Sequence, residues 1–394
     1  MTTATPLTYP GLDVLRAQVS PAARELLAFL RVRRIGLLTN HTGRAIGGTP
    51  ALDVLRELGL NIVALFSPEH GFAGTHEGHV ESGQFGALPV HSLYGDTRRP
   101  TPEMLSEVDV LVCDLQDVGA RFYTYASTIA LCLEECLPRG IAVVVLDRPN
   151  PLGGQDIAGP SVDEAHRSFV GHLRVPIQHG LTVGELMRLH VEDEGLNDKG
   201  LHVVQCEGWT RDMTWPQTGL SWIAPSPNLP NFVAAAWYPA LCLCEFSNVA
   251  VGRGTEAPFQ VVGAPWMEPE RVIGVLNEQH PRVPWQGSSV VPLVNEFAPT
   301  RAIYEGQVCR GVRFERLRTP ATKPLPPVTL GLALLAALHR AHPGEFALDK
   351  ALPLLGSSAA LEMLRSGDVE SALKSGNEDV QRFEEKRRAF LLYS

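Results

Sequence analysis

The chain has 394 residues, of which 44% are hydrophobic and 20% are charged, a composition ordinary for a globular protein. This length exceeds what one hydrophobic core usually serves, so two domains are expected. The formal net charge of -9 predicts a surface that repels nucleic acid and anionic lipid, which argues against nucleic-acid-binding and membrane-binding functions.

The first 150 residues alternate between predicted strands and helices. Strands are predicted over residues 34–39, 61–66, 108–114 and 141–147, and helices over 49–58 and 125–137. The strands are almost continuously apolar, which indicates a parallel sheet covered by helices on both faces, an α/β Rossmann-like domain. Polar residues follow the strands, and ligands of open α/β sheets bind beyond the carboxyl ends of the strands.

The alternation of predicted strands and helices is less regular after residue 160. Thr182-Val-Gly-Glu185 forms a capping box that predicts a helix running to about residue 194. The stretch 215–239 is rich in Pro, Asn and Trp and is predicted to be a long ordered loop near the domain boundary. A strand over 240–246 and helices over 268–278, 329–341 and 378–391 follow. We therefore predict a Rossmann-like catalytic domain over residues 1–235 and a smaller α+β domain over 236–394, with the active site in the cleft between them.

The sequence lacks the motifs of common cofactors and of serine hydrolases. The first strand is followed by Thr39-Asn-His-Thr-Gly43, without the G-x-G-x-x-G spacing of a dinucleotide site, and neither a Walker A motif nor a G-x-S-x-G elbow is present. The spacing of the early histidines matches no zinc signature; these are His41, His70, His76 and His79. An enzyme with no metal and no organic cofactor is predicted.

The cysteines and the N-terminal residues indicate the cellular compartment of the protein. Cys132 and Cys136 lie four apart on a predicted helix, and Cys242 and Cys244 lie on one face of a predicted strand, as small core residues do. Residues 1–10 show no secretory signal pattern, and the longest apolar stretch, about 328–338, is too short to span a bilayer. The sequence as it stands predicts a cytoplasmic protein with reduced thiols, exported only if the sequence is a processed form.

The strongest local signal for catalysis is Phe66-Ser-Pro-Glu-His-Gly71. Glu69 comes just past a buried strand, followed by His70, and partial desolvation of a carboxyl group there would suit a general acid. The alternative is a glutamate that only caps a helix or completes a turn.

Two further segments carry groups that could bind a sugar. In the first, Asp114 follows a strand, and Arg121, Tyr123 and Tyr125 surround the start of a helix, where they could stack on a sugar and hold a carboxylate. An Asp–Arg pair that shapes the loop is the alternative. The second segment runs from 225 to 256 and contains Asn228, Glu245, Arg253 and Glu256. Arg253 lies between two glycines that would let a ligand approach, or it pairs with Glu256.

These blocks together resemble the NamZ-type exo-β-N-acetylmuramidases, a glycoside hydrolase family formerly known as a domain of unknown function. The similarity runs through most of the chain, over residues 11–14, 38–43, 67–71, 114–125, 147–154, 226–230, 251–255 and 263–266. It implies release of terminal β-1,4-linked N-acetylmuramic acid from peptide-free peptidoglycan fragments, and a Rossmann-like domain followed by a smaller one. It also implies that Glu69 is catalytic.

The resemblance and the residues together define the candidate site. Glycoside cleavage usually uses two carboxyl groups, and muramic acid carries a lactyl carboxylate that a cation would select. Glu69 is the predicted acid, and Glu245, Asp114 and Glu256 compete for the second role. Arg253, ahead of Arg121, is the predicted cation. The remaining predicted substrate-binding residues are Asn40, His70, Tyr123, Asn150 and Asn228.

Two alternatives remain at this point. One is an N-acetylglucosaminidase on the same scaffold, which would lack a requirement for the lactyl group. The other is a non-catalytic protein that binds muropeptides, in which Glu69 acts only as a hydrogen-bond acceptor. Turnover of a muramic acid glycoside separates both from the main prediction.

Overall fold

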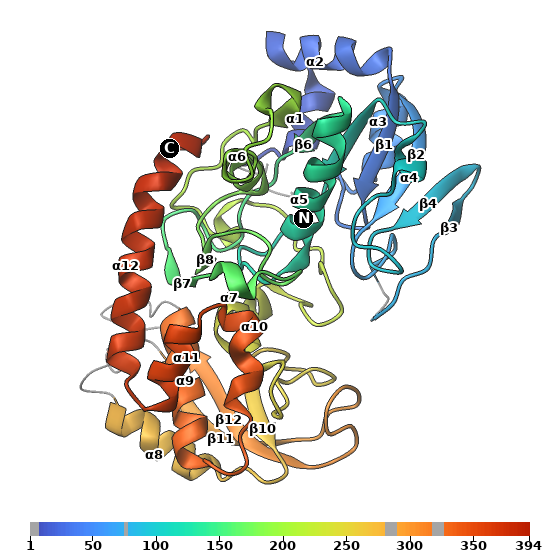
Figure 1. Ribbon diagram of the computed structural model, residues 1–394. Helices are drawn as coiled ribbons and strands as arrows, with labels where there is room; N and C mark the ends of the chain where they lie inside the picture. The colour runs from blue at the N-terminus through green and yellow to red at the C-terminus, as the bar shows by residue number, and fades with distance from the viewer. Residues whose placement is uncertain (1–7, 75–77, 280–289, 317–326) are drawn as a thin grey trace.

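The first domain is built on a seven-stranded sheet with the order β3-β4-β2-β1-β5-β6-β9 (Figure 1). The computed structural model describes residues 8–74, 78–279, 290–316 and 327–394. All neighbouring strands from β4 to β9 pair in parallel, and β3 pairs antiparallel with β4. The strands are β1 (Arg34–Thr39), β2 (Asn61–Ser67), β3 (Gly83–Phe85), β4 (Leu88–Ser92), β5 (Val110–Asp114), β6 (Ala142–Leu146) and β9 (Leu201–Val204).

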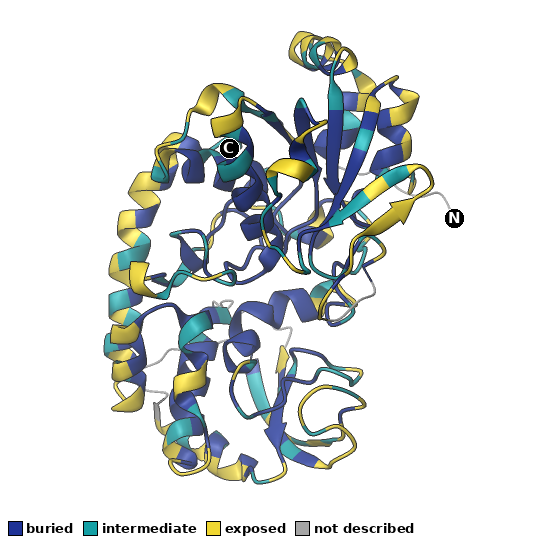
Figure 2. Ribbon diagram, turned by 45° about the vertical axis from the view of Figure 1, so that its right-hand side comes forward, coloured by how far each residue is buried: buried dark blue, intermediate teal, exposed yellow. Residues whose placement is uncertain are grey.

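Both faces of this sheet are buried, because side chains along each strand alternate between two cores. In β5, Val110 and Val112 belong to one core and Leu111 and Cys113 to the other. The central strands β1, β5 and β6 are accordingly buried along nearly their whole length in Figure 2, whereas β3 at the edge is exposed. The predicted α/β class with a parallel sheet is confirmed.

Helices cover the two faces of the sheet unequally. The smaller core lies under α1 (Gly11–Ala17), α2 (Pro21–Arg31) and α3 (Ala51–Glu57). The larger core lies under α5 (Thr124–Cys136) and α6 (Val183–Asp193) and continues into the second domain. The first domain also contains α4 (Pro102–Leu105) and a two-stranded sheet of β7 (Ala158–Ser161) and β8 (Pro176–Gln178).

The second domain has a three-stranded antiparallel sheet, with the order β10-β12-β11, packed against helices. Its strands are β10 (Val261–Ala264), β11 (Val290–Phe297) and β12 (Cys309–Arg316). Its helices are α7 (Phe232–Leu241), α8 (Pro269–Gln279), α9 (Pro327–Ala341), α10 (Leu352–Leu355), α11 (Ser358–Arg365) and α12 (Val369–Arg387).

The end of the chain returns to the first domain. The helix α12 runs beside both domains and packs against β7, β8, α9 and α11 (Figure 1). Beyond it, the Tyr393 hydroxyl donates to Asp147 Oδ2 at 2.7 Å, and the Leu392 N–H donates to Glu185 Oε1 at 2.8 Å. The C-terminal residues thereby cover buried acidic groups that belong to the first domain.

The predicted strands at 34–39, 61–66, 108–114 and 141–147 are confirmed, as is the capping box that begins α6. The strand predicted over 240–246 is wrong, because α7 continues to Leu241 and a 3-10 turn spans Cys242–Cys244. The predicted loop over 215–239 ends early, since Asn231 caps α7 by accepting from the Ala234 N–H. Residues 232–244 are almost continuously apolar, and such a run does not distinguish a buried helix from a buried strand.

The cysteines and the helices bear on two further predictions. All seven cysteines are free and buried, consistent with thiols that act as core residues, although Cys242 and Cys244 lie in a turn and not on a strand. Within the described ranges, no helix has the length and apolar character needed to cross a bilayer.

Candidate active site

Glu69 lies in a tight turn directly after β2. The Gly71 N–H donates to Pro68 O at 3.0 Å, and His70 adopts the left-handed backbone conformation (φ 70°), which is uncommon outside glycine. The half-buried Glu69 carboxylate accepts a hydrogen bond from Thr124 Oγ1 at 2.5 Å. Thr124 is the first residue of α5, so Glu69 lies at the positive end of a 13-residue helix.

Four tyrosine hydroxyls lie close enough to Glu69 for its charge to act on them: Tyr94, Tyr123, Tyr125 and Tyr238. Burial is the largest cause that raises each pKa, and the Glu69 carboxylate adds to it; the pKa of Tyr94 rises to about 12. Tyr123 packs edge-on against Tyr125 and Tyr238, with centroids 4.7 and 5.9 Å apart. Glu69 is therefore accompanied by neutral hydroxyl groups and aromatic rings.

The second domain contributes Glu245 and Arg253. Arg253 NH1 donates to Glu245 Oε1 at 2.8 Å, and Cys242 Sγ donates to Glu245 Oε2 at 3.1 Å. The pKa of Tyr238 is raised first by burial, then by Cys242 and Glu245, and also by Glu69. Tyr238 thus lies within the influence of a carboxylate from each domain.

The glycines beside Arg253 serve the packing of the loop itself. Gly252 and Gly254 have φ angles of 78° and 74°. A Cβ at Gly252 would lie 2.4 Å from Ala257 O, and one at Gly254 would lie 2.7 Å from Arg301 N. The sequence analysis expected these glycines to give a ligand access to Arg253. In the structure they instead let neighbouring backbone of the same domain approach.

Asn40 acts on the site through Tyr125. Asn40 Nδ2 donates to the Tyr125 hydroxyl at 2.7 Å, and that hydroxyl donates to Pro225 O at 2.7 Å. His41 Nε2 meets Ala224 O at 2.7 Å, so it carries the proton there. Burial lowers the pKa of His41, and His70 contributes in the same direction, which places the two histidines near each other. The end of β1 therefore fixes the loop at 224–225 beside the tyrosines.

Asp114 is buried and paired, which removes it from the catalytic candidates. Its two carboxylate oxygens accept from Arg148 Nε at 2.5 Å and NH2 at 2.9 Å, and the side chain is 0% exposed. The sequence considered an ion pair with Arg121, but the partner is Arg148, which follows β6. Sequence spacing could not reveal this pair because β5 and β6 become neighbours only in the sheet.

Arg121 is likewise removed as a ligand for the lactyl carboxylate. Its guanidinium donates to Pro160 O, Val175 O, Leu354 O and Leu355 O at 2.8 to 3.0 Å, and it is 1% exposed. Burial lowers the pKa of Arg121 to about 9. The first two carbonyls belong to the first domain and the last two to the second, so this arginine joins the domains.

The other predicted binding residues have varied surroundings. Asn150 Nδ2 donates to Leu181 O at 2.9 Å in a buried position that shapes a loop. Asn228 Oδ1 accepts from Arg301 NH2 at 3.0 Å and links loops of the two domains. Glu256 is exposed, and Arg253 pairs with Glu245 and not with Glu256 in the structure.

Asp117 gives a prediction for the pH dependence of stability. Burial raises the pKa of Asp117 to about 6, and the Gly119 N–H at 2.8 Å only partly offsets this. A raised pKa favours the protonated folded state, so the stability it contributes is full below the ordinary pKa and is lost as the pH rises through 6. Between pH 5 and pH 7 the loss is about 1 kcal/mol for this residue.

We expect Asp117→Asn to reduce the difference in free energy of unfolding between pH 5 and pH 7, measured by urea denaturation. Burial also raises the pKa of Asp147 to about 6, and Asp147 keeps its own contribution to the pH dependence in this variant. An unchanged difference between the two pH values would show that Asp117 is ionised throughout this range.

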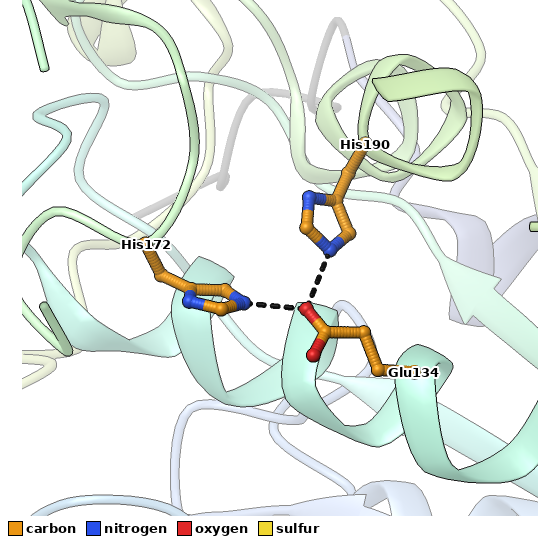
Figure 3. Close-up of side chains that lie close together, drawn as sticks. All are labelled: Glu134, His172 and His190. Atoms are coloured by element: carbon orange, nitrogen blue, oxygen red, sulfur yellow. Dashed lines mark hydrogen bonds and ion pairs between the residues drawn. The ribbon is translucent and has the colours of Figure 1, made fainter. Parts of the chain in front are cut away.

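One group of metal-ligating types appears among the described residues, and it was not predicted. Glu134, His172 and His190 place one ligand atom each within 4.8 Å of the others (Figure 3). Of the histidines considered from the sequence, His76 lies outside the described residues, and His79 lies 3.9 Å from Asp96. The sequence did not reveal the group of Glu134, His172 and His190, because its members are 38 and 18 residues apart and match no spacing motif.

The sequence indicated only two of the four tyrosines near Glu69. Tyr123 and Tyr125 belong to a motif that had been noted, but Tyr94 follows an unpredicted strand and Tyr238 lies on a helix predicted as loop. Thr124 could have been found, since it begins the predicted helix next to the predicted site.

Comparison with known proteins places this arrangement in a family. The model described as "Exo-beta-N-acetylmuramidase NamZ, N-terminal" matches residues 35–233, and its C-terminal counterpart matches residues 236–393. The chain belongs to the NamZ family. It is 37% identical over 380 residues to the peptidoglycan β-N-acetylmuramidase NamZ of Bacillus subtilis strain 168, covering 92% of this chain and 88% of that protein.

Two solved structures share the NamZ-family fold of this chain. A DUF1343 family protein from Bacteroides fragilis NCTC 9343 is 31% identical, with a TM-score of 0.84 over 99% of this chain and 100% of the other. A second protein of that family and strain is 29% identical, with a TM-score of 0.76 over 98% and 99% of the two chains. The two NamZ models adjoin at the start of α7, where the chain enters the second domain.

Proposed function

We propose that this NamZ-family chain is an exo-acting glycoside hydrolase that releases terminal β-1,4-linked N-acetylmuramic acid from peptide-free peptidoglycan fragments. The observation that carries the proposal is that Glu69 and Glu245, from different domains, both act on the Tyr238 hydroxyl. Glycoside cleavage usually uses two carboxyl groups, and these two lie near the same tyrosine. The sugar would bind between the domains, beside Glu69 and the half-buried ring of Tyr94.

In the proposed reaction, Glu69 gives a proton to the glycosidic oxygen as the bond from that oxygen to the anomeric carbon breaks. Water supplies the hydroxyl of the released sugar, and Glu245 either takes a proton from that water or first bonds to the anomeric carbon. Thr124 and Tyr94 orient the Glu69 carboxyl group through their hydroxyls. Asp114 takes no part, because it is 0% exposed and held by Arg148, whereas Glu245 is partly exposed.

The test is turnover of a chromogenic N-acetylmuramic acid glycoside beside the matching N-acetylglucosamine glycoside. The proposal expects release of chromophore from the muramic substrate and much slower release from the other. Equal rates would favour a broader glycosidase, and binding without turnover of either would favour a carbohydrate-binding protein.

Preference for the lactyl group is expected to depend on Arg253. A guanidinium has five N–H donors, and Arg253 lies next to Glu245. A charge-assisted hydrogen bond contributes about 1.5 to 3 kcal/mol, so Arg253→Ala should lower kcat/KM on the muramic glycoside roughly ten- to a hundredfold. The glucosamine analogue should lose much less, measured in the same assay.

Arg310→Ala is the matched control, since Arg310 is a half-exposed arginine on β12 that pairs with Glu270 and is remote in sequence from the Arg253 loop. It should leave both rates unchanged. Equal losses on both substrates in Arg253→Ala would mean that Arg253 supports Glu245 and does not recognise the lactyl group.

A further inference from the structure

The group of Glu134, His172 and His190 lies where three separate segments meet (Figure 3). Glu134 is on α5, His190 is on α6, and His172 is in the loop between β7 and β8. Both imidazoles direct Nε2 at the same carboxylate oxygen: His172 Nε2 lies 2.5 Å and His190 Nε2 lies 3.0 Å from Glu134 Oε1. We propose that these three side chains form a binding site for a divalent transition metal ion of the zinc class.

The donor set suits such an ion. Two imidazole nitrogens and one carboxylate oxygen are ligands that zinc accepts, with bonds of about 2.0 to 2.2 Å. Tetrahedral geometry at those lengths separates neighbouring ligand atoms by about 3.3 Å. The observed separations, from 2.5 Å to at most 4.8 Å, bracket that value.

The surroundings complete the site. Arg99 NH1 contacts Glu134 Oε2 at 2.6 Å, so the carboxylate oxygen opposite the ligand atom is held, as outer partners of metal-binding carboxylates are. His190 is 2% exposed, whereas His172 and Glu134 are 13% and 16% exposed. The group is therefore partly exposed to solvent through His172 and Glu134.

Metal binding replaces protons at this site. Each Nε2 that contacts Glu134 Oε1 in the structure does so as an N–H donor, and a bound ion requires both nitrogens to be deprotonated. Binding therefore requires each imidazole to carry its remaining proton on Nδ1.

The site is connected to Glu69 along two paths. The loop that carries His172 also carries Phe169, whose ring lies 5.8 Å from that of Tyr94, and Arg98 stacks on both rings. Tyr94 in turn contacts Glu69. The helix that carries Glu134 begins at Thr124, which donates to Glu69. A metal ion at this site would therefore fix the elements that position Glu69, without contacting substrate.

The experiment is titration of chelator-treated full-length protein with Zn²⁺ at pH 7.5, by calorimetry and by competition with a chromophoric chelator. Wild type should bind one equivalent, with a rise in Tm, and Co²⁺ in its place should give the visible bands of a four-coordinate ion. His172→Gln and Glu134→Gln should each weaken binding about a hundredfold or more, since outer-partner losses alone cost 10- to 100-fold.

His79→Gln, which removes an exposed imidazole outside the group, should bind as wild type does. Absence of one-equivalent binding, or equal affinity in His172→Gln and wild type, would overturn the metal site and leave the group as a purely ionic junction. Because no readout uses turnover, failure here is distinguishable from failure of the proposed hydrolase activity.

Discussion

Glu69→Gln is expected to lower kcat on a muramic acid glycoside by about 10² to 10⁴, the usual contribution of a general acid or base. Glutamine keeps the size of the side chain and an oxygen that can accept from Thr124, so the turn after β2 should persist. Circular dichroism and Tm should match wild type, and single-turnover rates should show that the chemical step is slowed.

Glu81→Gln is the control for this change, because Glu81 is an exposed glutamate on the same stretch of chain. It should retain full activity. A Glu69→Gln enzyme with near wild-type kcat would assign Glu69 a purely structural role and direct the search for the acid to Glu245.

Arg121→Met is expected to reduce the free energy of unfolding by about 3 to 5 kcal/mol, because each buried polar group left without a partner costs about 1 to 3 kcal/mol. The variant leaves four buried carbonyl oxygens without their donor, at Pro160, Val175, Leu354 and Leu355. Methionine fills part of the volume, so the loss should come mainly from the unpaired carbonyls. Urea denaturation followed by fluorescence and by circular dichroism measures it.

The matched control is Arg310→Met, which removes a half-exposed arginine and should change stability by less than about 1 kcal/mol. If Arg121→Met kept wild-type stability and instead lost selectivity for the lactyl group, Arg121 would be restored as the substrate cation.

The sheet could be predicted because its strands are locally determined. Segments such as Val110–Asp114 are short, apolar and bounded by polar turns, and the parallel pairing follows from the helices between them. The strand predicted over Ala240–Phe246 was wrong for the opposite reason. Apart from Glu245 its side chains are apolar, so no period distinguishes helix from strand, and its packing against α9 decides the outcome.

The site was predictable where function depends on one motif and not where it depends on pairing across the fold. Glu69 could be proposed because the strand, the turn and the following helix are all local. The partners of Asp114 and Arg121 lie 34 to 234 residues away, so the sequence offered them as binding groups when the structure uses them as supports. Tyr238 was missed because its segment was predicted as loop.

The position of the last residues has a consequence for how the protein is made. Asp147, Glu185 and Arg211 of the first domain receive the C-terminal residues 392–394 as partners. During synthesis the first domain leaves the ribosome many residues before that segment exists, and domains begin to fold as they emerge. The first domain can therefore reach its final packing only once residues 392–394 have emerged from the ribosome, although its own sheet is complete by residue 204.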